Sequence, residues 1–140
     1  MGDDKFASQD VIKELIDNSK VIAIVGLSDK PERPSFGVAS YLKEQGYRIV
    51  PVNPTRDEII GEKSYPDLKS IPGDIDIVDI FRRSDAVGPI VDEAIEVGAG
   101  AVWFQEGVIN EEAAQKALDA GLKVVMNRCL LKEHRRLSGY

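Results

Sequence analysis

The chain has 140 residues, of which 43% are hydrophobic, and its formal net charge is −6 at pH 7. This length and composition predict one domain over residues 1–140, with a substantial core. The negative charge argues against a nucleic-acid partner, because neutralising phosphates requires a basic surface. The longest apolar runs are strand-sized, far short of the roughly 20 residues that span a bilayer, so no membrane partner is expected.

Cysteine usage and the N-terminal segment indicate the compartment. The one cysteine, Cys129, excludes an intramolecular disulfide and is typical of a reducing environment. The first ten residues, MGDDKFASQD, are acidic and contain no apolar stretch of a secretory signal. We therefore expect a cytoplasmic location.

Apolar periodicity and capping residues predict helices that alternate with strands. The expected elements are, in chain order, a helix over 9–18 with Ser8 as N-cap, a strand over 20–26, a helix over 35–45 with Ser35 as N-cap, a strand over 47–52, a strand over 75–81, a helix over 84–97 with Ser84 as N-cap, a strand over 101–104, a helix over 110–120, a strand over 122–126 and a helix over 130–137. Residues 55–74 predict a loop with one short strand or helical turn. The alternation predicts an α/β sandwich of three layers around a mainly parallel sheet of about five strands.

Open parallel sheets bind ligands beyond the carboxyl ends of their strands, near the point where the strand order reverses. The residues at the ends of the predicted strands are therefore candidate site residues. They are Gly26, Leu27 and Ser28; Val52, Asn53, Pro54, Thr55 and Arg56; Phe81, Arg82 and Arg83; Gln105, Glu106 and Gly107; and Asn127, Arg128 and Cys129.

The turn after the first strand is the most informative of these segments. A strand that passes into a helix N-terminus creates an anion site, because free N–H groups and the helix dipole point the same way. The loop and the start of the helix add Arg33, Pro34, Ser35 and Phe36 to the candidate site. A dinucleotide fingerprint G-x-G-x-x-G is missing, because Ser28 and Pro31 occupy the second and third glycine positions.

The segments VGLSDKPERPSFGVASYL, GYRIVPVNPT, GEKSYPDL, DIVDIFRRSDAV, AVWFQEGVINEEAA and VVMNRCLLKEHRRL follow one another between about Asp10 and Leu137. Together they resemble the small stand-alone CoA-binding proteins, a family similar to the N-terminal CoA-binding domain of the succinyl-CoA synthetase α subunit. The resemblance implies a Rossmann-like fold that binds coenzyme A (CoA) or an acyl-CoA across the strand tips. The phosphorylated histidine of the synthetase lies in a following domain, so that role does not carry over to His134.

The residues suit this ligand on physical grounds as well. CoA carries a pyrophosphate and a 3′-phosphate; the Ser28 hydroxyl, the N–H groups of residues 26–29 and Arg33 suit the pyrophosphate. An NAD-selective site would place an acid at the end of the second strand, where this chain has Val52, Asn53 and Pro54 with Arg56 close by. An uncharged strand end beside a cation can accommodate a phosphorylated ribose, so the absence of this acid does not exclude NADP as the ligand.

Each candidate also has a purely structural explanation. The Gly26 segment, the Asn53–Pro54 pair and the Gln105–Gly107 segment could be plain turns. Arg82 and Arg83 could be solvated or could pair with Glu58 or Asp85. Phe81 could be core or could contact an adenine or pantetheine group, and Trp103 is expected in the core.

No arrangement of residues supports catalysis. Glu106 is a lone acid at the strand tips, and Cys129 and His134 should lie on different faces of the last helix, as a structural cysteine and a surface or capping histidine. We therefore expect no metal site, no catalytic residue, and a carrier, sensor or regulatory module that binds CoA or an acyl-CoA. Two alternatives stay open: an NAD(P)-binding Rossmann oxidoreductase, and a partner-dependent subunit of an acyl-CoA synthetase-like enzyme. A homo-oligomer or a protein partner is compatible with each of them.

Overall fold

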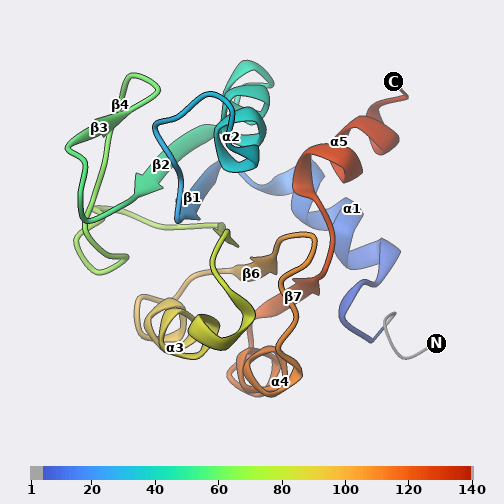
Figure 1. Ribbon diagram of the computed structural model, residues 1–140. Coiled ribbons are helices and arrows are strands. Elements are labelled where there is room, and N and C mark those ends of the chain that lie inside the picture. The colour runs from blue at the N-terminus through green and yellow to red at the C-terminus, as the bar shows by residue number, and fades with distance from the viewer. Residues whose placement is uncertain (1–4, 140) are drawn as a thin grey trace.

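The computed structural model describes residues 5–139 (Figure 1). Residues 1–4, which begin the acidic N-terminal segment, and Tyr140 lie outside the described part. The helices are α1 (Gln9–Asn18), α2 (Pro34–Glu44), α3 (Val87–Glu96), α4 (Glu111–Asp119) and α5 (Leu130–Ser138), with a 3₁₀ turn, η2, at Ser84–Ala86. The strands are β1 (Val21–Val25), β2 (Arg48–Val52), β3 (Glu58–Ile59), β4 (Glu62–Lys63), β5 (Ile77–Ile80), β6 (Ala101–Phe104) and β7 (Lys123–Met126).

Five strands form one parallel sheet in the order β2-β1-β5-β6-β7. Their residues are almost all buried, as expected for a parallel sheet that is covered on both faces. The two short strands β3 and β4 form a separate antiparallel pair. The protein is thus an α/β protein with a Rossmann-like sheet, which confirms the predicted fold class.

Helices cover both faces of this sheet (Figure 1). On β1, Ile22 and Ile24 point into a core with side chains of α1, α2 and α5, whereas Ala23 and Val25 point into a core with α3 and α4. The alternation follows from the two-residue period of a strand, which sends neighbouring side chains to opposite faces. Three layers result, and the loops after the strands all leave from the same edge.

Two predicted helix caps are wrong. Helix α2 begins at Pro34, which suits the first helical position, and Ser35 lies inside the first turn, where its hydroxyl accepts the Ser28 N–H at 3.0 Å. Ser84 belongs to the 3₁₀ turn before α3, and its hydroxyl accepts the Ile109 N–H at 2.9 Å. In both cases the hydroxyl accepts a hydrogen bond from a loop residue outside the helix, and local capping rules do not take such contacts into account.

Between β2 and β5 the structure holds two short strands, more than the single strand or turn that was expected. The Tyr65 N–H donates to Pro51 O at 3.0 Å, which ties this segment to the edge strand β2. Among the described residues, no helix has both the length and the apolar character to cross a membrane.

Candidate ligand-binding site

The strand order reverses at β1. From β1 the chain passes to β2 on one side and later to β5 on the other, which opens a crevice at the carboxyl end of β1. Gly26 follows β1 there, with a φ of +86°, and a Cβ at this position would lie 2.5 Å from the carbonyl oxygen of Phe81. Only glycine meets both requirements without strain, and its small size keeps the crevice open.

Three pockets meet at Gly26. The first, about 370 Å³, is lined by Gly26, Ser28, Lys30, Arg33, Pro34, Ser35 and Phe81. The second, about 260 Å³, is lined by Gly26, Leu27, Ser28, Asp29, Lys30, Val52, Asn53, Pro54, Thr55, Arg56 and Arg82. The third, about 230 Å³, lies on the α3 side, where Val25, Val52, Pro54, Pro66, Ala86 and Ile90 contribute apolar surface beside the charged residues Asp67, Arg82 and Glu93. One continuous region thus combines anion donors with apolar surface.

Hydrogen bonds within the β1–α2 loop shape one wall of the first pocket. The loop is held by the Ser28 N–H, which donates to Ser35 Oγ, and by the Lys30 N–H, which donates to Ser28 Oγ at 3.1 Å. Helix α2 has neither a side-chain cap nor an acidic residue in its first turn, whereas α1 and α4 have both. The positive end of the α2 dipole is therefore not neutralised where it borders the pocket.

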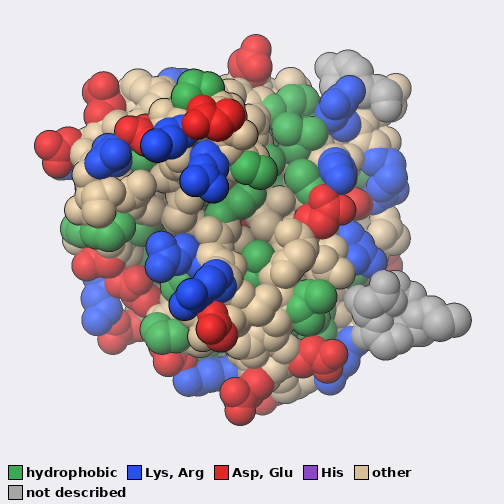
Figure 2. Space-filling model, in the orientation of Figure 1, with side chains coloured by type: hydrophobic (Ala, Val, Ile, Leu, Met, Phe, Trp, Pro, Cys, Tyr) green, Lys and Arg blue, Asp and Glu red, His purple; other side chains and the backbone are tan. Residues whose placement is uncertain are grey.

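Cationic side chains surround the same region. Lys30, Arg33 and Arg82 line the pockets, and within residues 5–139 none of these three side chains takes part in an ion pair. Figure 2 shows Lys and Arg side chains gathered on this face of the molecule. In a chain with a net charge of −6, such a group of unpaired cations favours a negatively charged ligand.

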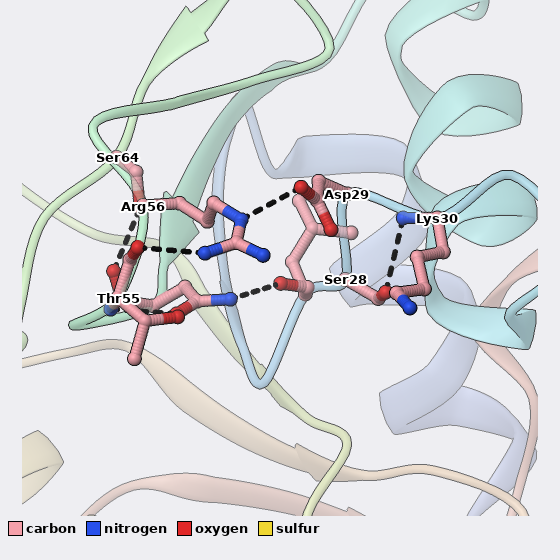
Figure 3. Close-up of polar contacts among 8 residues, drawn as sticks. Ser28, Asp29, Lys30, Thr55, Arg56 and Ser64 are labelled. Carbon is pink, nitrogen blue, oxygen red and sulfur yellow. Dashed lines mark hydrogen bonds and ion pairs between the residues drawn. The ribbon is translucent and has the colours of Figure 1, made fainter.

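Contacts across the second pocket join its two walls (Figure 3). The Asn53 side-chain amide donates to Leu27 O at 3.0 Å, and Asn53 Oδ1 accepts from Thr55 N at 2.9 Å. Arg56 Nε donates to Asp29 Oδ2 at 2.7 Å, and this hydrogen bond lowers the pKa of the Asp29 carboxyl. Asp29 is therefore ionised at neutral pH.

The remaining predicted residues, Phe81 and Arg83 after β5 and Phe36 in α2, differ in burial and contacts. Phe81 is partly buried and forms part of the first pocket. Arg83 extends into solvent, with 84% of its side chain exposed, and pairs with Asp85 at 3.3 Å. Phe36, in the first turn of α2, is partly buried.

The predicted residues after β6 make structural contacts outside the three pockets. Gln105 is buried, and its Oε1 accepts the Leu130 N–H at 3.1 Å at the start of α5. Glu106 pairs with Lys132 at 2.9 Å. The Gly107 N–H donates to Asn127 Oδ1 at 2.8 Å. These contacts fix the β6 loop against α5 and β7.

Sequence reasoning left two residues of the first two pockets, Asp29 and Lys30, out of the site. Of the third pocket it also missed Val25, Pro66, Asp67, Ala86, Ile90 and Glu93. Lys30 and Asp29 follow Ser28 directly, so a rule that counted the whole β1–α2 loop would have included them. Thr55, one of the predicted strand-end residues, donates its hydroxyl hydrogen bond to Asn53 Oδ1 at 2.8 Å.

Cys129 and His134 do not form a pair. Cys129 occupies the N-cap position of α5 without a side-chain cap bond, while His134 Nδ1 lies 2.7 Å from the Tyr41 hydroxyl. His134 is thus a partly buried residue that contacts α2 from α5, a packing contact that the expectation of a surface or capping histidine did not include. Trp103 is fully buried, as predicted, and its Nε1–H donates to Arg128 O at 2.8 Å. Among residues 5–139 no cluster of three or more His, Cys, Asp or Glu side chains could hold a metal ion.

The fold and this crevice define the class: a Rossmann-like protein with a ligand-sized opening at the switch point of its sheet. Comparison with known proteins specifies the family. A family model described as CoA binding domain matches residues 20–135, and the chain belongs to that family.

The relatives fall into two groups: small proteins that this chain covers almost completely, and longer CoA ligase chains that it covers in part. The uncharacterized protein YneT of Bacillus subtilis is 46% identical over 123 residues, which make up 88% of this chain and 91% of YneT. A hypothetical protein from Pyrococcus horikoshii OT3 has a solved structure with a TM-score of 0.90 and 45% identity, covering 93% of this chain and 92% of that one. The α subunit of ADP-forming acetate–CoA ligase II from Pyrococcus furiosus is 30% identical over 124 residues, 81% of this chain but only 27% of the subunit.

Proposed function

We propose that this protein binds CoA or an acyl-CoA in the crevice at Gly26 and acts as a carrier, sensor or regulatory module without catalysis of its own. The observation that supports this most strongly is the group of unpaired cations, Lys30, Arg33 and Arg82, around the open N-terminus of α2. Membership of a CoA-binding domain family points to the same ligand.

The pyrophosphate of the ligand fits the first pocket. There the N-terminal end of α2, without a side-chain cap or an acid in its first turn, brings the positive end of the helix dipole to the pocket, and Arg33 lines it. The third pocket offers apolar surface from Val52 and Ile90 for a flat base or an alkyl arm. A charged group and an apolar group next to each other match the mixed chemistry of CoA.

An NAD(P)-dependent oxidoreductase receives less support. The end of β2 carries Val52, Asn53 and Pro54, the Asn53 amide is used to hold Leu27 O, and none of these three residues is the acid that an NAD site places there for a ribose 2′-OH. The glycine turn also contains one glycine, Gly26, where a dinucleotide fingerprint needs three.

A second candidate function rests on the similarity to the acetate–CoA ligase α subunit. In that reading the chain supplies a CoA site to a larger assembly, in which a partner contributes the reaction chemistry. The lone acid at the β6 tip, Glu106, is paired with Lys132, which gives a self-contained acid–base mechanism no support. A cytoplasmic location fits both candidates, because CoA-dependent chemistry and a single free cysteine suit a reducing compartment.

Titration calorimetry with CoA, dephospho-CoA, NAD and NADP tests the ligand. We expect CoA to bind at least about tenfold more tightly than NAD, which corresponds to about 1.4 kcal/mol. Equal affinity for NAD would overturn the assignment. Native mass spectrometry of protein purified from its source adds the ligand that travels with the chain, and a co-purified second polypeptide would favour the subunit role.

A further inference from the structure

The second pocket contains one acidic side chain, Asp29, at a position where the proposed ligand brings negative charge. Its carboxylate comes from the β1–α2 loop and meets Arg56 from the loop after β2, with Nε and Oδ2 2.7 Å apart (Figure 3). Arg56 Nη1 also donates to Thr55 O at 2.9 Å, which holds the guanidinium in place. The Asp29–Arg56 pair therefore spans the pocket, and its hydrogen bond engages the Arg56 guanidinium, a group that is suited to bind a phosphate.

A ligand phosphate can replace the Asp29 carboxylate on Arg56 at a small cost in free energy. The side chains of Arg56 and Asp29 are 45% and 38% exposed, so solvent screens their attraction. A carboxylate carries a single charge, whereas a terminal phosphate monoester carries nearly two and offers three oxygens to a guanidinium. A phosphodiester within a pyrophosphate has a single charge per phosphorus and competes less well for the same group.

We propose that Asp29 is a gate for phosphate: it holds Arg56 across the second pocket, and the 3′-phosphate monoester of CoA takes its place when the ligand binds. The inference rests on the proposed function and adds which end of CoA reaches Arg56. Asp29 then lowers the affinity of the site for its own ligand, and Arg56 distinguishes CoA from dephospho-CoA.

The test compares CoA and dephospho-CoA by calorimetry in the wild-type protein, Asp29→Asn and Arg56→Gln. Asp29→Asn removes the competing charge, so CoA should bind about three- to tenfold more tightly while dephospho-CoA changes less than about twofold. Arg56→Gln should weaken CoA about tenfold and leave dephospho-CoA within about twofold. Asp17→Asn is the matched control, because Asp17 pairs with Lys13 on α1, away from the three pockets.

The other outcomes overturn the inference in distinct ways. An equal gain for both ligands in Asp29→Asn would assign Arg56 to the pyrophosphate. A loss for both would make the pair a support for the two loops, and thermal melts of each variant separate that loss from unfolding. If wild-type protein binds neither ligand, the proposed function itself fails, and the gate fails with it.

Discussion

The hydroxyl of Tyr41 lies 2.7 Å from Nδ1 of His134 and thereby joins α2 to α5. The rings of Tyr41 and Tyr47 pack edge-on against the imidazole, with centroids 5.4 and 5.8 Å away. Partial burial lowers the pKa of His134 below its ordinary value. In the neutral tautomer that carries its proton on Nε2, His134 Nδ1 accepts a hydrogen bond from the Tyr41 hydroxyl, and protonation of the imidazole removes this acceptor.

This relationship predicts a pH-dependent stability. Because the pKa of His134 is lower in the folded than in the unfolded chain, its contribution is complete above about pH 6.5 and is lost as the pH falls below that value. Thermal melts between pH 8 and pH 5 should show a declining Tm in the wild type and a flatter dependence in His134→Gln. Parallel curves for the two proteins would contradict the assignment.

A second pH effect of opposite sign is expected from Asp79. This residue of β5 is fully buried, and neither carboxylate oxygen has a hydrogen-bond partner, so burial raises its pKa well above the ordinary value. The folded state therefore holds the proton more tightly than the unfolded state does. Stability should fall as the pH rises above about 4, by at most about 1.4 kcal/mol per pH unit, until the folded-state pKa is reached.

The comparison with Asp79→Asn isolates this effect, since asparagine keeps the shape of the side chain and does not ionise. Chemical denaturation should give the variant a stability advantage at pH 7 that shrinks toward pH 4. A difference between the two proteins that stays constant with pH would show that Asp79 has a partner in solution.

Gly26→Ala should impair both stability and ligand binding. The added Cβ would meet the Phe81 carbonyl oxygen at 2.5 Å and force alanine into a left-handed conformation. We expect a loss of about 1–3 kcal/mol in the free energy of unfolding. Gly37→Ala is the matched control, because Gly37 lies in α2 with open space around it, and there alanine should stabilise by about 0.5–1 kcal/mol. Normal CoA affinity in folded Gly26→Ala would move the ligand away from this crevice.

Arg33 and Arg82 should act as phosphate ligands, whereas Arg83 should not. Arg33 and Arg82 line the pockets without ion-pair partners in the described part of the chain, and Arg83 extends into solvent beside Asp85. Replacement of a true phosphate ligand by alanine should cost about 1.5–3 kcal/mol, roughly a ten- to hundredfold loss of CoA affinity. Arg83→Ala should change the affinity less than about twofold in the same calorimetric series. If all three variants bind like the wild type, the proposed site is in the wrong place.

Much of the site could be predicted from local sequence patterns. The apolar runs identified every strand of the main sheet, since a strand buried on both faces is largely apolar. Gly26 was identified because it ends a buried strand that leads to a helix N-terminus, and the structure adds its left-handed conformation, with a φ of +86°. Segments at strand ends then converge on one edge by the geometry of any parallel sheet, which is why residues 26–28 and 52–56 were found together.

Pairings between distant segments were decided only by the tertiary structure. The order β2-β1-β5 brings Asp29 opposite Arg56, and no local pattern states which strands are neighbours. The same reason explains why Gln105, predicted as a site residue, bonds the start of α5, and why His134 contacts Tyr41 of α2. Periodicity and turn residues act over a few positions and are written in the sequence, whereas the partner of a polar side chain depends on which elements pack together.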